Sequence, residues 1–275
     1  MKPFIGLDIG GTKCAVLLAR VDHGIHIDDK IRFDTEAHKG FSQALAKLYA
    51  AIGALLSRRG LSPADIGAFG ISCGGPLDSR RGVILRPPNL PGWENVPLPR
   101  MLTDRYGVPA YLQNDANACA LVEWKLGAGR GTRDMIFLTM GTGMGAGVIA
   151  GGRLLRGFTD MGGEVGHLRL SEDGPVGFGK AGSFEGFTSG GAIARQAQAF
   201  TRALTEAGTP PKWARDGVPE ADITAKLIAD YAKAGDADAA ELYRRVGDWL
   251  GRGLALLVDA FNPERIVIGS IFARC

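Results

Sequence analysis

Apolar residues recur along the chain with two spacings, every second residue in some stretches and every third or fourth in others. The first spacing is typical of β-strands and the second of amphipathic helices. A helix is predicted over residues 41–59, where one face carries Ala44, Leu45, Leu48, Ile52, Leu55 and Leu56, and Gly60 ends it. Further helices are predicted at 98–106, 116–126, 190–207, 222–234 and 239–261, and strands at 4–10, 13–21, 25–34, 66–72, 82–86, 108–112 and 265–269, the last of them buried. This alternation of strands and helices places the chain in the α/β class.

Two stretches repeat the order apolar strand, Gly/Thr turn, apolar strand. The first covers residues 4–18, with Gly10, Gly11, Thr12 and Lys13 in its turn, and the second covers residues 135–150, with Gly141, Thr142 and Gly143. Glycine lets backbone N–H groups come close to a bound anion, and Thr12 and Lys13 add a hydroxyl group and a positive charge. Taken alone, the first stretch is equally compatible with an ordinary hairpin whose turn is solvated. The repeat favours two phosphate-binding turns, one in each half, that hold a nucleotide in a cleft.

A carboxylate, Asp8, lies near the end of the first apolar run. A negative charge is unusual in a strand that is expected to be buried. Its position beside a phosphate-binding turn makes sense if a divalent cation lies between the carboxylate and the phosphate groups. Asp8 is therefore a candidate neighbour of a magnesium ion.

Asn114 and Asp115 stand where a predicted strand ends and a helix begins. Both residue types are favoured N-caps of helices, so a purely structural role is one interpretation. Ligands of open α/β sheets bind beyond the carboxyl ends of the strands, and a carboxylate there can accept a proton from a substrate hydroxyl. The two roles are compatible only if a different residue caps the helix.

Two glycine-rich segments follow the second hairpin. Glu164 and His167 lie three residues apart in the first, and Glu185 lies in the second. A histidine that stands alone is more often structural, and a glutamate that stands alone is more often solvated. Here, however, many neighbouring residues are glycines, so few other side chains are available to bind a ligand. Carboxylates, amides and imidazoles together suit a polyhydroxylated ligand, because each sugar hydroxyl both donates and accepts hydrogen bonds.

Composition excludes several classes of protein. The 275 residues suffice for one large or two medium domains, and the net charge of +3 comes from interspersed charges without a basic stripe for nucleic acid. No apolar run is long enough to span a membrane, and a strand begins almost at once, so neither a membrane anchor nor a signal peptide is expected. The four cysteines have no paired spacing, which favours reduced thiols and a cytoplasmic location.

Taken in order, the motifs resemble those of the ROK family of sugar kinases and sugar-responsive repressors, nearly from end to end. They are LDIGGTK at 7–13, SCGGPLD at 72–78, NLPGW at 89–93, NDANA at 114–118, LTMGTGMGAG at 138–147, GGEVGH at 162–167 and NPERIVIGS at 262–270. The resemblance implies the two-domain actin/hexokinase-like (ribonuclease H-like) fold. It also implies ATP-dependent transfer of a phosphoryl group to a hydroxyl of a glucose-like hexose.

The resemblance assigns roles position by position. Asp115 is expected to be the catalytic base, and the sugar is expected to contact Gly75, Asn89, Asn114, Glu164, His167 and Glu185. The ATP phosphates are expected at Gly10, Gly11, Thr12, Lys13, Gly141, Thr142 and Gly143, with Asp8 near Mg²⁺ and contacting it through water. The expected domains are 1–115, with the first turn and part of the sugar pocket, and 116–275, with the second turn. A homodimer is the family expectation.

Two departures from the family pattern stand out. Many members bind a structural zinc ion through three cysteines and the histidine of the Glu-x-Gly-His motif, but this chain has Val176, Phe178 and Ser183 where those cysteines would be. No zinc site is therefore expected, and apolar packing of Val176 and Phe178 is expected instead. The chain also ends at residue 275, where relatives continue with an adenine-contacting turn and helices, which favours a truncated second domain.

Two alternatives to an active kinase stay open. One is a sugar-binding regulator, although the first strand begins too early in the chain to leave room for a DNA-reading domain. The other is a catalytically degenerate member, since the zinc cysteines and the usual C-terminal segment are missing. The sequence does not identify the sugar.

Overall fold

The computed structural model describes residues 2–270 and falls into two compact units. The first unit comprises Met1–Cys119 and Arg156–Gly162, and the second comprises Ala120–Leu155 and Gly163–Cys275. The expected boundary after residue 115 differs from this division in two respects. The structure divides inside a helix, at Cys119, and returns residues 156–162 to the first unit.

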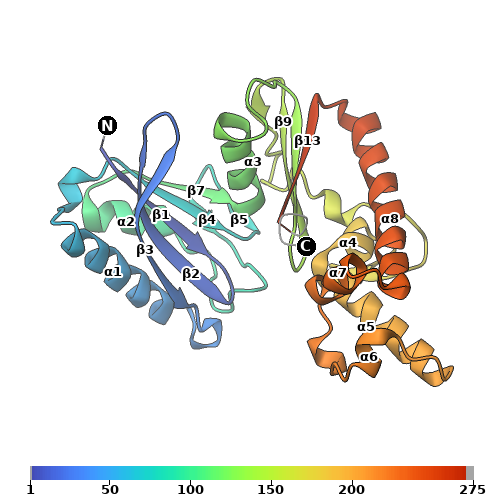
Figure 1. Ribbon diagram of the computed structural model, residues 1–275. Coiled ribbons are helices and arrows are strands. Elements are labelled where there is room, and N and C mark those ends of the chain that lie inside the picture. Colours follow the sequence, from blue (N-terminus) through green and yellow to red (C-terminus); the bar gives the residue numbers. More distant parts are fainter. Residues whose placement is uncertain (1, 271–275) are drawn as a thin grey trace. The chain divides into compact units, whose positions relative to one another are not determined.

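A five-stranded mixed sheet forms the centre of the first unit (Figure 1). Its strands lie in the order β3 (Ile25–Asp34), β2 (Lys13–Val21), β1 (Phe4–Ile9), β4 (Phe69–Cys73) and β7 (Ala110–Asn114). The first three are antiparallel, whereas β4 and β7 run parallel to β1. The strand expected at 82–86 is shorter, since only β6 (Val83–Ile84) pairs with β5 (Leu77–Asp78).

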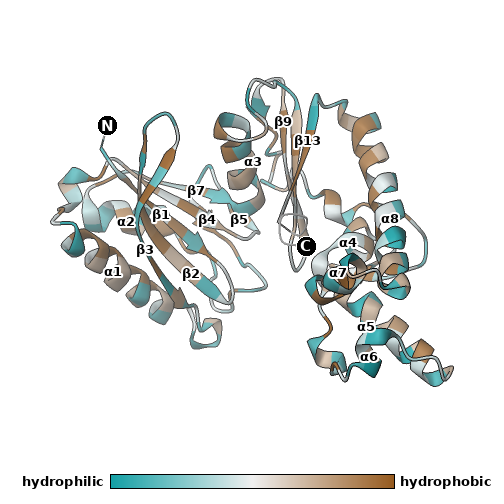
Figure 2. Cartoon of the chain, in the orientation of Figure 1, coloured by the Kyte–Doolittle hydropathy of each residue, from teal (hydrophilic) through white to brown (hydrophobic). Residues whose placement is uncertain are grey.

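Helices α1 (Phe41–Arg58) and α2 (Leu98–Tyr106) contribute to the core of this unit. Five of the six residues predicted for the apolar face of α1 are buried: Ala44, Leu48, Ile52, Leu55 and Leu56. Leu45 is only half-buried, and Ala51, which was not predicted, is buried. Figure 2 shows hydrophobic and hydrophilic residues side by side on α1, as expected for an amphipathic helix. This stripe belongs to one hydrophobic cluster with residues of β1, β2 and β4, and the burial of its apolar surface stabilises the unit.

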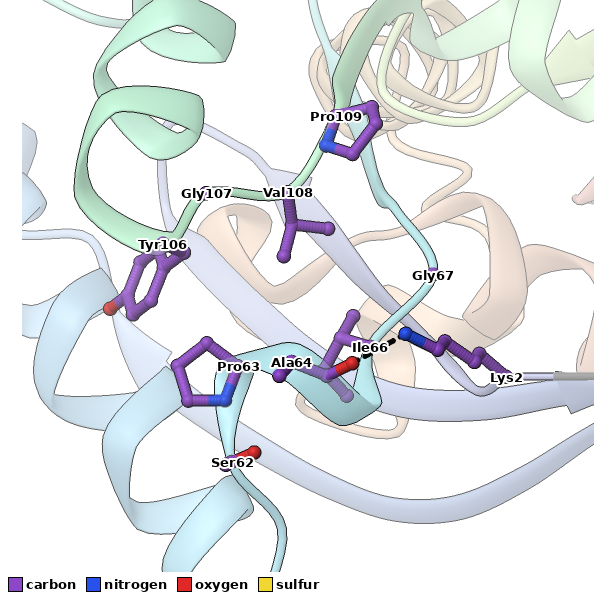
Figure 3. Close-up of a pocket in the computed structure, with 10 residues that line it drawn as sticks. All are labelled: Lys2, Ser62, Pro63, Ala64, Ile66, Gly67, Tyr106, Gly107, Val108 and Pro109. Carbon is purple, nitrogen blue, oxygen red and sulfur yellow. Dashed lines mark hydrogen bonds between the residues drawn. The ribbon is translucent and has the colours of Figure 1, made fainter.

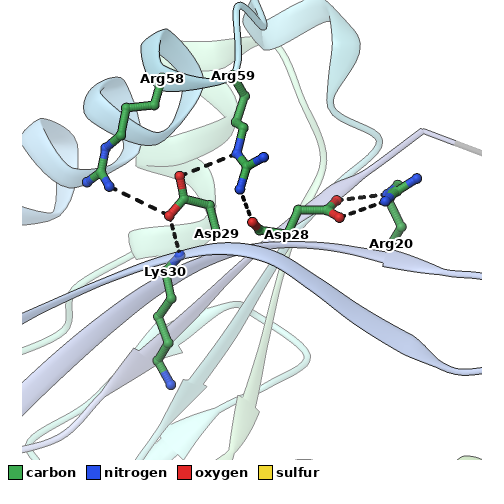
Figure 4. Close-up of polar contacts among 6 residues, drawn as sticks. All are labelled: Arg20, Asp28, Asp29, Lys30, Arg58 and Arg59. Carbon is green, nitrogen blue, oxygen red and sulfur yellow. Dashed lines mark hydrogen bonds and ion pairs between the residues drawn. The ribbon is translucent and has the colours of Figure 1, made fainter.

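Ion pairs connect β3 to the C-terminal end of α1 (Figure 4). Asp29 lies 3.6 Å from Arg58 Nη1 and 3.4 Å from Arg59 Nε. Asp28 accepts two hydrogen bonds from Arg20 of β2, at 2.8 and 2.7 Å. The pairing of β2 with β3 shifts at Leu18/Ala19, next to these residues. Since the pairs are solvent-exposed, each contributes little to stability by itself.

The sheet of the second unit has the order β10 (Arg153–Leu154), β9 (Met144–Ala150), β8 (Met135–Met140) and β13 (Arg265–Ser270). Strands β8 and β9 form the predicted second hairpin. The expectation that β13 is buried is wrong, because Arg265 is exposed and Ile266–Gly269 are only half-buried. Within the described residues β13 pairs with β8 alone, so one of its edges has no neighbouring strand.

Six α-helices lie within residues 115–270. They are α3 (Asp115–Leu126), α4 (Phe184–Thr188), α5 (Gly190–Glu206), α6 (Lys212–Arg215), α7 (Ala225–Lys233) and α8 (Ala237–Phe261). Side-chain oxygens set four of the starts: Ser183 caps α4, Ser189 caps α5, Thr224 caps α7 and Asp236 caps α8. These caps explain why α7 begins later, and α8 earlier, than hydrophobic periodicity predicts. No helix in residues 2–270 is long and apolar enough to cross a membrane.

Candidate active site

The candidate residues of the first unit gather at the carboxyl ends of its parallel strands. Asp8 in β1 pairs with Ser72 in β4, and Cys73 at the end of β4 pairs with Asn114 at the end of β7. Asp115 follows as the first residue of α3. This edge of the sheet is where open α/β folds bind their ligands.

Asn114 rather than Asp115 caps helix α3. The Oδ1 atom of Asn114 accepts a hydrogen bond from the backbone N–H of Asn117 at 3.2 Å. Asp115 Oδ1 accepts only from the adjacent N–H of Ala116, at 2.8 Å, and the residue is exposed. The helix cap therefore falls on Asn114, and the carboxylate of Asp115 is left exposed.

Asp8 and Asp115 are close enough to interact electrostatically. Asp8 is exposed, unlike its neighbours Leu7 and Ile9, but partial desolvation by nearby protein still raises the pKa of its carboxyl group, and the charge of Asp115 raises it further. Lys30 and Arg32 oppose this shift. Two neighbouring carboxylates beside the predicted phosphate-binding turn fit Mg²⁺, which is usually held by one or two carboxylates together with substrate phosphates. A bound cation would relieve the repulsion between the two carboxylates.

Thr35, which the sequence analysis did not identify, holds the first Gly/Thr turn in place. This residue is 1% exposed and follows the end of β3. Its hydroxyl donates to the carbonyl oxygen of Gly10 at 2.6 Å, and its N–H donates to the carbonyl oxygen of Thr12 at 2.9 Å. The turn closes with a hydrogen bond from Gly10 N to Lys13 O at 3.1 Å, so the side chains of Thr12 and Lys13 stay exposed.

Two close approaches connect the first turn and the strand ends to the predicted sugar residues. A Cβ atom on Gly11 would lie 2.5 Å from the carbonyl oxygen of Asn89 and 2.8 Å from its Cβ. A Cβ atom on Gly75 would lie 3.7 Å from Asn114 Nδ2. The structure thus brings Gly11 next to Asn89 and Gly75 next to Asn114.

The second turn, between β8 and β9, is held by α4 and α5. The N–H of Gly190 donates to Gly141 O at 2.8 Å, and the N–H of Gly191 donates to Thr142 O at 3.2 Å. Glu185 Oε2 accepts a hydrogen bond from Met144 N at 2.8 Å. A predicted sugar ligand, Glu185, is therefore bonded directly to the predicted phosphate-binding turn.

Glu164 and His167 lie in a segment that packs onto β9. His167 Nε2 is 3.8 Å from Glu164 Oε2, and the two side chains are 24% and 36% exposed. Gly163 has a φ of +96°, and a Cβ atom there would lie 2.9 Å from Ala146 O, so the residue needs to be glycine for both reasons. This close packing places Glu164 and His167 in the same part of the second unit as Glu185 and the second turn.

The segment that replaces the zinc cysteines has a different internal structure from the one expected. Val176 is 54% exposed, so the expectation that it packs is wrong, whereas Phe178 stacks on His167. Ser183 is buried, and its hydroxyl accepts from Gly186 N and donates to Gly177 O. Among residues 2–270 no three His, Cys, Asp or Glu side chains are arranged to hold a metal ion.

A cavity of about 620 Å³ opens elsewhere on the first unit, among residues that include Lys2, Ala64 and Pro109 (Figure 3). Lys2 Nζ donates to Ala64 O at 2.6 Å across it. Lys2, Gly67 and Pro109 precede β1, β4 and β7, so this cavity lies at the amino ends of the parallel strands. It is separate from the site at their carboxyl ends.

Known proteins resemble the chain over most of its length. The sequence model of the ROK family matches residues 4–273. A glucokinase of Streptomyces coelicolor is 35% identical over 266 residues, which are 96% of this chain and 80% of that enzyme. A xylose repressor of Caldicellulosiruptor bescii is 30% identical over 97% of this chain and 65% of its own length.

Solved structures agree with the sequence comparisons. The structure of a ROK family glucokinase from Streptomyces griseus, in complex with glucose and AMPPNP, has a TM-score of 0.77 and 33% identity. The match covers 97% of this chain and 82% of the glucokinase chain. The predicted two-domain actin/hexokinase-like fold is thereby confirmed.

Proposed function

The chain belongs to the ROK family, and from that premise we propose that it transfers the γ-phosphoryl group of ATP to a hydroxyl group of a glucose-like hexose. The glucokinase relatives confirm the prediction of a sugar kinase. The arrangement of residues at the start of α3 supports the more specific proposal, that a carboxylate there serves the reaction. Asn114 caps the helix, so Asp115 presents an exposed carboxylate beside Asp8, at the edge of the sheet where ligands bind.

We propose that Asp115 is the general base. It would accept the proton of the sugar hydroxyl as that oxygen bonds to the γ-phosphorus and the bond to the leaving ADP oxygen breaks. Phosphoryl transfer depends mainly on positioning and charge neutralisation, so the base orients the hydroxyl as much as it deprotonates it. Bound Mg²⁺ would neutralise phosphate charge, with Asp8 as its nearest protein group, directly or through water.

The backbone N–H groups of the two Gly/Thr turns are proposed to bind the ATP phosphates, assisted by Thr12 and Lys13. Two features of each turn support this proposal: its tip is exposed, and hydrogen bonds fix its base. Such fixed donors stabilise developing charge without reorganising during the reaction. Gly11 and Asn89 are in contact, so a phosphate and a sugar group would lie close together there.

The sugar is proposed to bind Gly75, Asn89, Asn114, Glu164, His167 and Glu185. Glu164 and His167 are 3.8 Å apart and partly exposed, so a hydroxyl group can donate to one and accept from the other. Glu185 already accepts from Met144 N and would use its remaining acceptor capacity for a hydroxyl. This set distinguishes polyols from apolar ligands without identifying one hexose.

A coupled assay with ATP across glucose, fructose, mannose, allose and N-acetylated hexosamines tests the proposal. Asp115→Asn retains an oxygen for the N–H of Ala116 and removes the base, so kcat should fall by about 10²–10⁴-fold. Asp104→Asn is the matched control, because Asp104 is an exposed carboxylate on α2 that pairs with Arg100. Absence of turnover with every sugar, or equal kcat for the two variants, would refute the proposal.

A sugar-binding regulator or an inactive kinase is the second candidate, favoured by the similarity to the xylose repressor. Both would bind a sugar in calorimetry without consuming ATP. If the protein regulates without catalysis, Asp115→Asn should leave the affinity for the sugar and every other measured property unchanged.

We further propose that the protein works without zinc, since Val176, Phe178 and Ser183 offer no thiolate. Stoichiometric zinc in the purified protein would contradict this. The proposed homodimer is tested by light scattering during size-exclusion chromatography.

A further inference from the structure

The aromatic ring of Phe178 lies flat against the imidazole ring of His167. Their centroids are 4.3 Å apart, and the ring planes differ by 14°. Phe178 is nevertheless 67% exposed, so burial in a core does not explain a side chain of this size here. One face of the ring covers the imidazole, and most of the residue remains in contact with solvent.

The backbone at Phe178 is not one that phenylalanine favours. Val176–Gly177 (β11) and Lys180–Ala181 (β12) form an antiparallel hairpin whose two-residue turn is Phe178 and Gly179. Their φ angles are +47° and +72°, the left-handed pair that a type I′ turn requires. Asn-Gly is the preferred sequence in such turns. Phenylalanine at the first position strains the backbone, so the turn alone does not account for it.

The hairpin is anchored on both sides, which fixes where the ring of Phe178 can lie. Lys180 Nζ donates a hydrogen bond to the carbonyl oxygen of His167 at 2.9 Å. Ser183 Oγ donates to Gly177 O at 3.2 Å and accepts from Gly186 N at 3.1 Å, which connects the hairpin to the helix that carries Glu185. The base of the hairpin therefore cannot move without disturbing α4.

We propose that Phe178 is a positioning residue for sugar recognition. Its ring restricts rotation of the His167 imidazole and keeps Nε2 directed towards Glu164, which lies 3.8 Å away. This inference rests on the proposed function in one respect, since it assumes that His167 and Glu164 contact the sugar.

Three substitutions separate the ring from the turn. Phe178→Asn removes the ring and introduces the residue that the type I′ turn prefers, so the hairpin should form at least as well. Phe178→Tyr keeps the ring. Val176→Ala is the matched control, because Val176 is an exposed apolar residue of the same hairpin and is not one of the two stacked rings. Thermal unfolding checks that every variant is folded.

The first measurement needs no substrate. The chain has four histidines, so selective ¹³C labelling of histidine, with His167→Gln for assignment, resolves the His167 imidazole by NMR. A ring stacked on the imidazole shifts its ring-proton signals upfield. Phe178→Asn should abolish this shift, whereas Phe178→Tyr and Val176→Ala should preserve it. An unchanged signal in Phe178→Asn would overturn the proposal.

The second measurement separates positioning from folding. For the sugar that the wild type phosphorylates, Phe178→Asn should raise KM by roughly 2- to 10-fold, as expected for the loss of one aromatic pair, with kcat and the KM for ATP unchanged. Phe178→Tyr should restore the wild-type KM. A loss of kcat alone, or equal KM values in all variants, would overturn the proposal. A wild type without turnover would refute the proposed function instead, and the NMR result would still decide whether the stack orients His167.

Discussion

The two Gly/Thr turns share one sequence pattern, but different kinds of contact hold them. The turn at Gly10 is fixed by the hydroxyl and N–H groups of Thr35, a neutral, buried residue just beyond the next strand of the same sheet. The turn at Gly141 is fixed by the first N–H groups of α5 and by the charged side chain of Glu185.

This difference has a consequence for function. Thr35 contacts the first turn and is not among the candidate sugar residues, so its loss should affect nucleotide binding alone. Glu185 is bonded to the second turn and is also a candidate sugar ligand. In the second unit, therefore, the proposed sugar and nucleotide sites share a side chain, and a change there should affect both.

Among the substitutions that test this comparison of the two turns, the largest effect is expected at Glu185. Glu185→Ala removes both the acceptor for Met144 N and a sugar contact, and a misplaced reacting group can reduce rates by about 10²-fold. We expect kcat/KM to fall by about that factor, with higher KM values for both ATP and sugar. Glu185→Gln retains an acceptor oxygen, so KM for ATP should recover more than KM for sugar. Steady-state kinetics with each substrate varied decides this, and an effect on the sugar alone would show that the second turn does not need Glu185.

Gly11→Ala should have the next largest effect. The new Cβ would lie 2.5 Å from the carbonyl oxygen of Asn89, a backbone atom that cannot move without shifting the NLPGW segment. Such overpacking typically destabilises a protein by about 1–3 kcal/mol. The urea midpoint should fall accordingly, together with activity.

Gly70→Ala is the matched control for Gly11→Ala. Gly70 lies in β4 of the same unit, and nothing lies within 4 Å of the position its Cβ would take. Its midpoint should stay near that of the wild type. Equal losses in the two variants would mean that the contact between Gly11 and Asn89 has no special importance.

The sequence predicted both turns because strand periodicity and glycine positions are local properties of the chain. The residues that hold the turns were not predicted, since Thr35 lies 25 residues from Gly10, and Glu185 lies 41 residues from Met144. A lone threonine or glutamate at such a distance carries no local signal of its partner. The pairing emerges only when the sheet register and the packing of α4 are known.

The lack of a local sequence signal also explains the other differences between the prediction and the structure. Asn114 and Asp115 were both reasonable caps for α3, and only the geometry assigns the cap to Asn114. The sequence of β13 is as apolar as that of a central strand, but its position at an edge among the described strands leaves it half-buried. Short elements such as α4 and the β11–β12 hairpin have too few residues to show a period.

Thr35→Val tests whether the first turn is held independently of the sugar residues. Valine has nearly the same shape but lacks the hydroxyl that donates to Gly10 O, so stability should fall by about 1 kcal/mol. KM for ATP should rise while KM for the sugar stays constant, in contrast to Glu185→Ala. Thr35→Ser keeps the hydroxyl and should bind ATP as the wild type does. A higher KM for the sugar in Thr35→Val would mean that neither turn is held independently of the proposed sugar residues.

The smallest effect concerns the residue after Thr35. Glu36 accepts hydrogen bonds from Lys39 and Lys47, and these lower the pKa of its carboxyl group from 4.5 to about 2. Since the folded pKa lies below the unfolded one, this stabilisation is complete above about pH 4.5 and is lost as the pH falls towards 2. Between about pH 5 and pH 3 the wild type should lose slightly more stability than Glu36→Gln, in low salt, and added salt should reduce the difference. Parallel pH profiles of unfolding for the two proteins would show that these exposed ion pairs do not contribute to stability.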